Sequence, residues 1–408
     1  MISKKFLKTK TPKIYSVIRN LISDYNNLHN LDLIHSLQNE NKKNFDSIIS
    51  VPFFDYRKKI YEEDLKKSKN SFAYLEINNS CNINCVMCDT KSSTRKKKIM
   101  DLDLVESSLI KIKNLGIRKV SLHTIGDPLA NKKIEEVFSL LRKYDMQTSL
   151  SSNGLMLKKN LNTLKRYIDV CSDIKFSIDG CTKDVYEKIR FGGKWEDLLA
   201  NFEIALNELE PLGYRISVLN ILMKENYHQA GEYINFFSKY FKYPHERVEF
   251  DLLNSLSPSN DFFFKNNLFD KDTYLNKFCT LVSNPIPFIL VDGSLSVCCR
   301  DYDGSLIIGD TKKDSIDEIF ESDKFKELQI AHSDKGSNSF SKWSLCNSCY
   351  IVDDRISFIF TNLVKMIILK FKGNDGFFFQ RKIEKIVKFL GNINTHTSYI
   401  DFERELLN

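Results

Sequence analysis

Three cysteines occupy eight positions in the segment CNINCVMC, which runs from Cys81 through Cys85 to Cys88. Disulfide frameworks use an even number of cysteines, and a structural zinc site uses four ligands. Three thiolates suit a cubane iron–sulfur cluster in which three irons have protein ligands and the fourth has none. An open coordination position lets a metal site bind and activate a small molecule. The spacing therefore predicts a reactive iron–sulfur centre, with half of a zinc site or a set of buried thiols as the alternatives.

The composition narrows the classes of protein that can hold this motif. The chain has 408 residues, of which 42% are apolar, enough for two domains or for one large barrel with an appendage. The net charge of +7 is diffuse, with no arginine-rich stripe, which argues against a nucleic-acid partner. The basic N-terminus has no apolar stretch behind it, and no run reaches membrane-spanning length. We therefore expect a cytoplasmic protein whose ten cysteines stay reduced and serve metal binding or catalysis.

The elements that position the cysteine segment alternate between strands and helices. Strands are predicted at 72–79, 118–124, 146–154, 173–180, 214–223 and 246–256, and helices at 103–116, 131–144, 157–169, 194–209 and 228–241. This alternation predicts parallel strands with right-handed crossovers. Because eight strands close a full barrel, six predict an α/β fold with an open, partial (β/α)6 TIM-like barrel. The cysteines follow the first strand, at the carboxyl end where such folds carry their function.

The flanking segments have a different pattern from the barrel. We expect a helical N-terminal extension (1–70), the barrel (71–260), a small domain (261–350) and a helical tail (351–408). A β-hairpin is predicted at 288–299, with its turn at Asp292–Gly293. The apolar segment 356–371 is expected to pack on its own domain, with a membrane surface as the alternative. The run RKKK (95–98) is expected to be a solvated surface, and contact with an acidic electron donor is its alternative.

The C-x3-C-x2-C motif after the first strand of a partial barrel resembles the radical S-adenosylmethionine (SAM) superfamily. That resemblance implies a [4Fe–4S] cluster held by Cys81, Cys85 and Cys88, whose open iron chelates SAM. An electron from the cluster cleaves the sulfonium, and the resulting 5′-deoxyadenosyl radical abstracts a hydrogen atom from the substrate. The family usually has an aromatic residue just before the third cysteine, near the adenine, where this chain has the apolar and polarisable Met87.

Later strand ends carry further positions of the same resemblance. The turn TIGDP is similar to the family's Gly-Gly-Glu-Pro turn, with Ile125 in place of the first glycine and an aspartate as the acid. A carboxylate opposite the SAM ammonium is chemically sensible. SSNG is similar to Thr-Asn-Gly, FSIDG matches Ser-x-Asp-Gly, and an arginine follows where the family places one near the SAM carboxylate. The resemblance thus implies SAM contacts by Gly126, Asp127, Ser152, Asn153, Ser177, Asp179 and Arg190. A lone histidine such as His123 is expected to be structural.

A second cysteine set lies in the small domain. Gly293 and Cys298 form a G-x4-C motif, and CNSC supplies a C-x2-C pair. This resembles the auxiliary-cluster domains called SPASM and, because no cysteine follows residue 349, their shorter single-cluster form called twitch. The resemblance implies one auxiliary [4Fe–4S] cluster held by Cys279, Cys298, Cys346 and Cys349. Because neighbouring residues on a strand face opposite ways, Cys299 is expected to pack or face the other side. A four-thiolate zinc site is the alternative.

The sequence therefore predicts a radical SAM enzyme with one auxiliary cluster and no assigned catalytic side chain. The expected substrate is a peptide or a carbohydrate-type small molecule, and the expected electron donor is of the flavodoxin or ferredoxin type. The competing class is a non-catalytic iron–sulfur or zinc protein, an electron carrier or a scaffold on a degenerate barrel. The Gly-Asp-Pro, Asn-Gly and Ser-x-Asp-Gly positions favour the enzyme, because a scaffold has no need of a SAM pocket.

Overall fold

The computed structural model describes residues 72–255, 261–269, 274–275, 279–283, 285–333, 339–352 and 354–391, with Phe402 and residues 405–407. The predicted N-terminal extension, residues 1–70, lies outside the described residues. All four predicted auxiliary cysteines and all three cysteines of the CNINCVMC segment lie within them.

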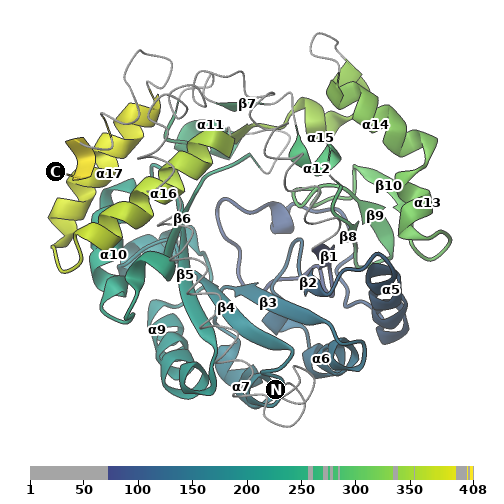
Figure 1. Cartoon of the computed structure of the whole chain (residues 1–408), viewed down its shortest axis with the longest axis horizontal. Helices are drawn as coiled ribbons and strands as arrows, with labels where there is room; N and C mark the ends of the chain where they lie inside the picture. Colours follow the sequence, from purple (N-terminus) through teal and green to yellow (C-terminus); the bar gives the residue numbers. More distant parts are fainter. Residues whose placement is uncertain are drawn as a thin grey trace, which may run out of the picture.

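Six parallel strands form the centre of a nine-stranded sheet and follow one another in chain order (Figure 1). They are β1 (Ala73–Leu75), β2 (Lys119–Ser121), β3 (Gln147–Ser152), β4 (Cys171–Ser177), β5 (Arg215–Leu222) and β6 (Val248–Leu252). Every neighbouring pair among them is parallel. Each lies within two residues of its predicted range, so the partial-barrel prediction is confirmed.

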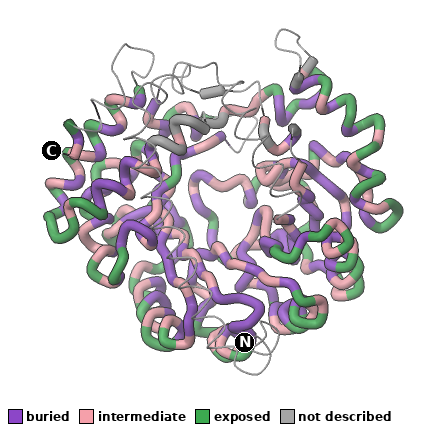
Figure 2. Tube along the Cα trace, in the orientation of Figure 1, coloured by how far each residue is buried: buried purple, intermediate pink, exposed green. Residues whose placement is uncertain are grey.

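Helices cover the outer face of the curved sheet in Figure 1, with exposed positions on their outer sides in Figure 2. They are α5 (Leu102–Asn114), α6 (Ile134–Lys143), α7 (Leu157–Arg166), α8 (Lys183–Ile189), α9 (Trp195–Ile204) and α10 (Ala230–Ser238). In α6 the buried residues are Ile134, Val137, Phe138 and Leu141, the spacing of one helix face turned to a core. Helix α8 was missed because seven residues are too few to show this period.

The predicted hairpin extends the sheet at the β1 edge. Strand β8 (Phe288–Ile289) pairs parallel with β1, and β9 (Ser294–Ser296) and β10 (Ile307–Asp310) follow antiparallel. The turn is where it was predicted: Gly293 has φ +89°, and the Asp292 carboxylate accepts a hydrogen bond from the Ser294 N–H at 3.0 Å. The hairpin thus places the small domain directly beside the loop that follows β1.

The rest of the small domain consists of short elements. They are α11 (Asp261–Asn266), β7 (Tyr274–Leu275), α12 (Thr280–Ser283), α13 (Ile316–Phe320), α14 (Asp323–Ser333), α15 (Ser344–Asn347) and β11 (Ile351–Val352), with β7 and β11 paired antiparallel. These lie on the side of the molecule away from α7 and α9 in Figure 1.

The C-terminal helices α16 (Asp354–Lys370) and α17 (Gly376–Gly391) pack at the opposite edge of the sheet, against β6 and α10 (Figure 1). Phe360, Leu363, Val364 and Ile367 of α16 are at most 2% exposed. The apolar segment 356–371 therefore packs on its own protein, as expected. Among the described helices, none combines the length and apolarity that a membrane span requires.

Candidate functional site

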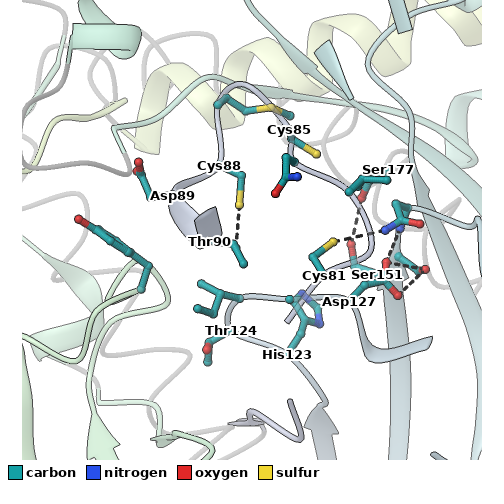
Figure 3. Close-up of a pocket in the computed structure, with 18 of the residues that line it drawn as sticks. Cys81, Cys85, Cys88, Asp89, Thr90, His123, Thr124, Asp127, Ser151 and Ser177 are labelled. Atoms are coloured by element: carbon teal, nitrogen blue, oxygen red, sulfur yellow. Dashed lines mark hydrogen bonds between the residues drawn. The ribbon is translucent and has the colours of Figure 1, made fainter. Parts of the chain in front are cut away.

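A cavity of about 260 Å³ opens at the carboxyl ends of the parallel strands (Figure 3). The cysteine loop forms one wall, the turn after β2 and the ends of β3, β4 and β5 form the next, and residues 299–302 of the small domain complete it. Ten of the predicted site residues line it: Cys81, Cys85, Met87, Cys88, Gly126, Asp127, Ser152, Asn153, Ser177 and Arg190. Asp179 does not.

The three cysteine thiols each have a different polar neighbour at this cavity. The Sγ of Cys81 lies 3.5 Å from Asn153 Nδ2, that of Cys85 lies 3.4 Å from Arg190 Nη1, and that of Cys88 lies 3.0 Å from Thr90 Oγ1. The pKa of Cys81 is raised to about 12, mainly by burial, and the pKa of Cys85 is raised for the same main reason. Both are therefore thiols until a metal displaces their protons.

The loop that carries these cysteines is fastened to neighbouring elements by backbone hydrogen bonds. The N–H of Asn84 donates to Phe191 O at 2.8 Å, and the N–H of Val86 donates to Ile189 O at 2.9 Å. The N–H of Cys88 donates to Cys85 O at 3.1 Å. The loop therefore has a fixed path past the end of α8. In the described part of the chain, no three His, Cys, Asp or Glu side chains surround one point as they would a single metal ion, so the ligand predictions rest on spacing.

The Asp127 carboxylate joins the turn after β2 to the end of β3. It is 3% exposed and accepts hydrogen bonds from Leu129 N at 2.9 Å, Ser152 Oγ at 2.9 Å and Asn153 N at 2.7 Å. Burial raises its pKa, and the Asn153 N–H is the largest opposing cause. Both carboxylate oxygens of Asp127, the predicted SAM-facing acid, therefore accept hydrogen bonds, and these position Ser152 and Asn153. The Asn153 amide in turn reaches Asn82 Oδ1 at 2.9 Å, next to Cys81.

Replacing Gly126 by alanine is expected to destabilise this turn far more than the same change at Gly116. Both glycines have φ +82°. A Cβ added at Gly126 would lie 2.6 Å from Ser80 O, whereas a Cβ added at Gly116 would have no other atom within 4 Å. The left-handed backbone costs alanine about 1–2 kcal/mol at either position. Denaturant unfolding should therefore show that cost alone for Gly116→Ala and a larger loss for Gly126→Ala. Equal losses would show that the turn yields to the added methyl group.

Asp179 and Arg190 form a buried ion pair behind the cavity wall. The Arg190 Nε donates to Asp179 Oδ2 at 2.6 Å, and Asp179 Oδ1 accepts from Ile221 N at 2.7 Å. Burial would lower the pKa of Arg190, but Asp179 raises it and the net shift is upward. Asp179 therefore lies away from the cavity and holds the guanidinium that contacts Cys85.

Asp179→Asn is expected to lower the free energy of unfolding by about 3–5 kcal/mol, because it leaves the buried Arg190 without its counter-charge. Chemical denaturation of the apoprotein measures this loss. The matched control is Glu196→Gln, which breaks the exposed pair with Lys183 (2.7 Å) and should change stability little. Similar losses in the two variants would contradict a buried pair.

Several cavity residues escaped the sequence prediction. Cys299, Arg300 and Tyr302 reach the cavity from the end of the hairpin, and Thr124 and Ile221 reach it from the barrel. For the three residues of the small domain, the one sequence signal was their position directly after the G-x4-C motif; Thr124 and Ile221 had none. His123 also lines the cavity, with Nδ1 3.1 Å from Ser121 Oγ. Burial lowers its pKa to about 4, so it is neutral at pH 7.

A buried carboxylate connects the cysteine loop to the small domain. Glu76 is fully buried, forms an ion pair with Arg95, and accepts from the N–H of Val291 at 2.9 Å. In addition, Asp303 accepts from the Thr94 N–H at 2.6 Å. The run 95–98 is thus not a uniformly solvated surface: Arg95 is turned inward because a buried acid needs a partner, whereas Lys96 and Lys98 are exposed.

The cysteines of the small domain interact electrostatically with one another. Cys279 interacts with Cys298, Cys346 and Cys349. Burial is the main cause that raises the pKa of Cys346 to about 12. Cys299 lines the cavity and Cys298 does not, but the two thiols hydrogen-bond to each other, so the expected division of the pair between opposite faces stays a prediction. The four predicted ligands come from three separate stretches of the small domain, and their role as one ligand set stays a prediction.

Comparison with protein-family models identifies two domains. The model of the radical SAM superfamily matches residues 75–237, and that of an iron–sulfur cluster-binding domain, SPASM, matches residues 279–350. The two matches together cover more than half of the chain.

Two curated relatives illustrate the range of similar proteins. A GTP 3′,8-cyclase of Desulforamulus reducens is 26% identical over 148 residues, which are 35% of this chain and 45% of that protein. Mycofactocin maturase MftC of Mycobacterium tuberculosis is 23% identical over 171 residues, 40% of this chain and 41% of that protein. The matched region thus spans less than half of either relative.

Among solved structures, Streptococcus suis SuiB bound to precursor peptide SuiA has a TM-score of 0.50 and 14% identity. The match covers 76% of this chain and 77% of that one. At this level of identity the likeness concerns the fold alone.

Proposed function

The chain belongs to the radical SAM superfamily and contains an iron–sulfur cluster-binding domain, and from this premise we propose that it is an enzyme that cleaves SAM reductively and abstracts a hydrogen atom from its substrate. The observation that carries the proposal is the shared cavity. The C-x3-C-x2-C thiols, the predicted SAM contacts other than Asp179, and Cys299, Arg300 and Tyr302 of the small domain line it.

The donor set fits the cofactors that the family implies. Cys81, Cys85 and Cys88 present three thiols to one cavity, and the path of their loop is fixed by backbone hydrogen bonds. Three thiolates leave one iron of a cubane without a protein ligand, which is where SAM binds in the family. When bound, the [4Fe–4S] cluster and SAM supply one-electron reductive cleavage and a hydrogen-abstracting 5′-deoxyadenosyl radical.

The remaining residues of the cavity position SAM in this proposal. Arg190 lies against Cys85 and is therefore close to the SAM carboxylate, with Asp179 holding its guanidinium. Gly126 lets the backbone turn beside Ser80, and Asp127 orders Ser152 and Asn153, whose polar groups suit the ribose and carboxylate. Met87, 7% exposed in the cavity wall, would pack against the adenine in place of an aromatic ring.

The small domain contributes a second cluster in this proposal, with Cys279, Cys298, Cys346 and Cys349 as its four ligands. Because full ligation by protein would leave it no open iron, this cluster would take up an electron in a two-electron oxidation of the substrate or pass electrons onward. The substrate is a peptide or a carbohydrate-type small molecule, and a flavodoxin- or ferredoxin-type protein supplies the cleaving electron. We retain the segments 1–70, 71–260, 261–350 and 351–408 as the proposed domain division.

The proposal is tested by anaerobic reconstitution with iron and sulfide, followed by dithionite and SAM. Formation of 5′-deoxyadenosine, measured by liquid chromatography, is the expected result, with about eight irons per chain for two cubane clusters. Intact clusters without 5′-deoxyadenosine would favour a non-catalytic electron carrier or scaffold. About four irons with one zinc would contradict the auxiliary cluster.

A further inference from the structure

Arg300 connects the auxiliary cysteines to the cavity. It follows Cys298 and Cys299 after strand β9 and lines the cavity into which Cys81, Cys85 and Cys88 open. It belongs to neither of the cysteine motifs and to none of the proposed SAM contacts. It is therefore a charged cavity residue that still needs an explanation.

Arg300 contacts two sulfurs from different motifs. Its backbone N–H donates to Cys298 Sγ at 3.4 Å, and its Nη1 donates to Cys349 Sγ at 3.6 Å. Cys298 belongs to the G-x4-C motif and Cys349 to the C-x2-C motif, 49 residues from Arg300. A single residue thus bonds to one proposed ligand from each half of the cysteine set.

The charges around Arg300 come mainly from these sulfurs. Among the described residues, no carboxylate is paired with the Arg300 guanidinium as Asp179 is paired with that of Arg190. Asp251 of β6 is the acid that interacts with it at longer range. The Arg300 side chain is half-buried between these sulfurs and the cavity. A cation enclosed in this way needs a nearby anion.

Four thiolates around a cubane cluster supply that anion, and reduction makes it more negative. A fixed cation beside the sulfurs stabilises the reduced cluster more than the oxidised one, because the Coulomb attraction grows with the added electron. Hydrogen bonds to the sulfurs act in the same direction and are among the known determinants of cluster potential. Arg300 provides both.

We propose that Arg300 raises the reduction potential of the auxiliary cluster, so that the cluster accepts an electron from the substrate side of the cavity. The inference rests on the proposed function in one respect, that Cys279, Cys298, Cys346 and Cys349 hold this cluster. Arg300 acts through the cluster sulfurs, and is therefore a positioning residue and not a catalytic one.

The test isolates the auxiliary cluster in the full-length chain. A background with Cys81, Cys85 and Cys88 each replaced by alanine leaves the second cysteine set alone, and iron analysis shows whether it is filled. Redox titration followed by electron paramagnetic resonance then gives the midpoint potential. We compare the background with Arg300→Gln and Arg300→Lys, and use Arg118→Gln, which removes an exposed arginine, as the matched control.

Arg300→Gln should shift the midpoint potential to more negative values by at least 59 mV. For a one-electron couple this is a tenfold smaller equilibrium constant for reduction of the cluster. Arg300→Lys should show a smaller shift, because it keeps the charge and loses the planar fork. Arg118→Gln should show none. Equal potentials in all chains that hold the cluster would overturn the proposal. Loss of the cluster from both Arg300 variants would also overturn it, since Arg300 would then serve cluster retention.

Failure of the underlying assignment has a different signature. If the background variant binds no iron, the proposed ligand set is wrong. The proposal for Arg300 is then overturned as well, because there is no auxiliary cluster for it to act on. A filled cluster with an unshifted potential contradicts the role of Arg300 alone.

Discussion

Cys85→Ala is expected to reduce 5′-deoxyadenosine formation to background while the auxiliary cluster remains. Two thiolates cannot replace the three that the proposed cluster needs, and Cys85 is also the thiol that contacts Arg190, at 3.4 Å. Iron should fall from about eight to about four per chain, because each cubane holds four. Product is measured by liquid chromatography after dithionite and SAM, and iron by colorimetric assay on the same anaerobic sample.

Cys181→Ala is the matched control for this prediction. Cys181 is half-buried, and its N–H donates to Gln229 Oε1 at 3.1 Å, but it belongs to neither cysteine set. Both iron content and 5′-deoxyadenosine should stay at the level of the unmodified chain. If Cys85→Ala keeps full product formation, the C-x3-C-x2-C segment is not the SAM-cleaving site. If Cys181→Ala loses both iron and 5′-deoxyadenosine formation, the effect of Cys85→Ala cannot be assigned to the position of Cys85 in the motif.

The barrel was predictable because its signals are local. The six strands lie in short segments bounded by turn residues, and the longer helices between them, such as α6, have a 3.6-residue period. The order of the polar motifs along the chain then gave their place in space, since carboxyl ends of parallel strands meet at one edge. This is why Gly126, Asn153 and Ser177, which are far apart in the sequence, could be expected in one cavity.

Contacts between distant segments were not predictable from those signals. The pairing of β8 with β1 joins residues more than 200 positions apart, and the buried contacts of Glu76 with Arg95 and Val291 depend on it. No local pattern distinguishes an arginine that will be buried from its exposed lysine neighbours. The run 95–98 therefore looked uniformly solvated until the position of the hairpin was known.

The same limit applies to the hydrogen-bond partners of Asp127 and Asp179. Motif resemblance implied that Asp127 and Asp179 contact SAM directly. The structure shows Asp127 accepting hydrogen bonds from Ser152 and Asn153, and Asp179 held by Arg190 and Ile221. Which partner an acid takes depends on neighbouring strands, and spacing along the chain does not encode it.

Cys298→Ala is expected to remove the auxiliary cluster, whereas Cys299→Ala is expected to keep it. Cys298 Sγ accepts the Arg300 N–H at 3.4 Å and interacts electrostatically with Cys279, while Cys299 lines the cavity. Iron should fall to about four per chain in Cys298→Ala and stay near eight in Cys299→Ala. Iron and sulfide analysis, with electron paramagnetic resonance of the reduced protein, measures both.

Cys346→Ala provides the control, because the C-x2-C motif is expected to lose the second cluster in the same way as Cys298→Ala. All three variants should still form 5′-deoxyadenosine, since their changes leave the C-x3-C-x2-C segment intact. If Cys298→Ala retains about eight irons and Cys299→Ala loses four of them, Cys299 and not Cys298 is the ligand. The G-x4-C register would then be wrong, and the thiol facing the cavity would be the one that binds the auxiliary cluster, bringing that cluster to the cavity wall itself.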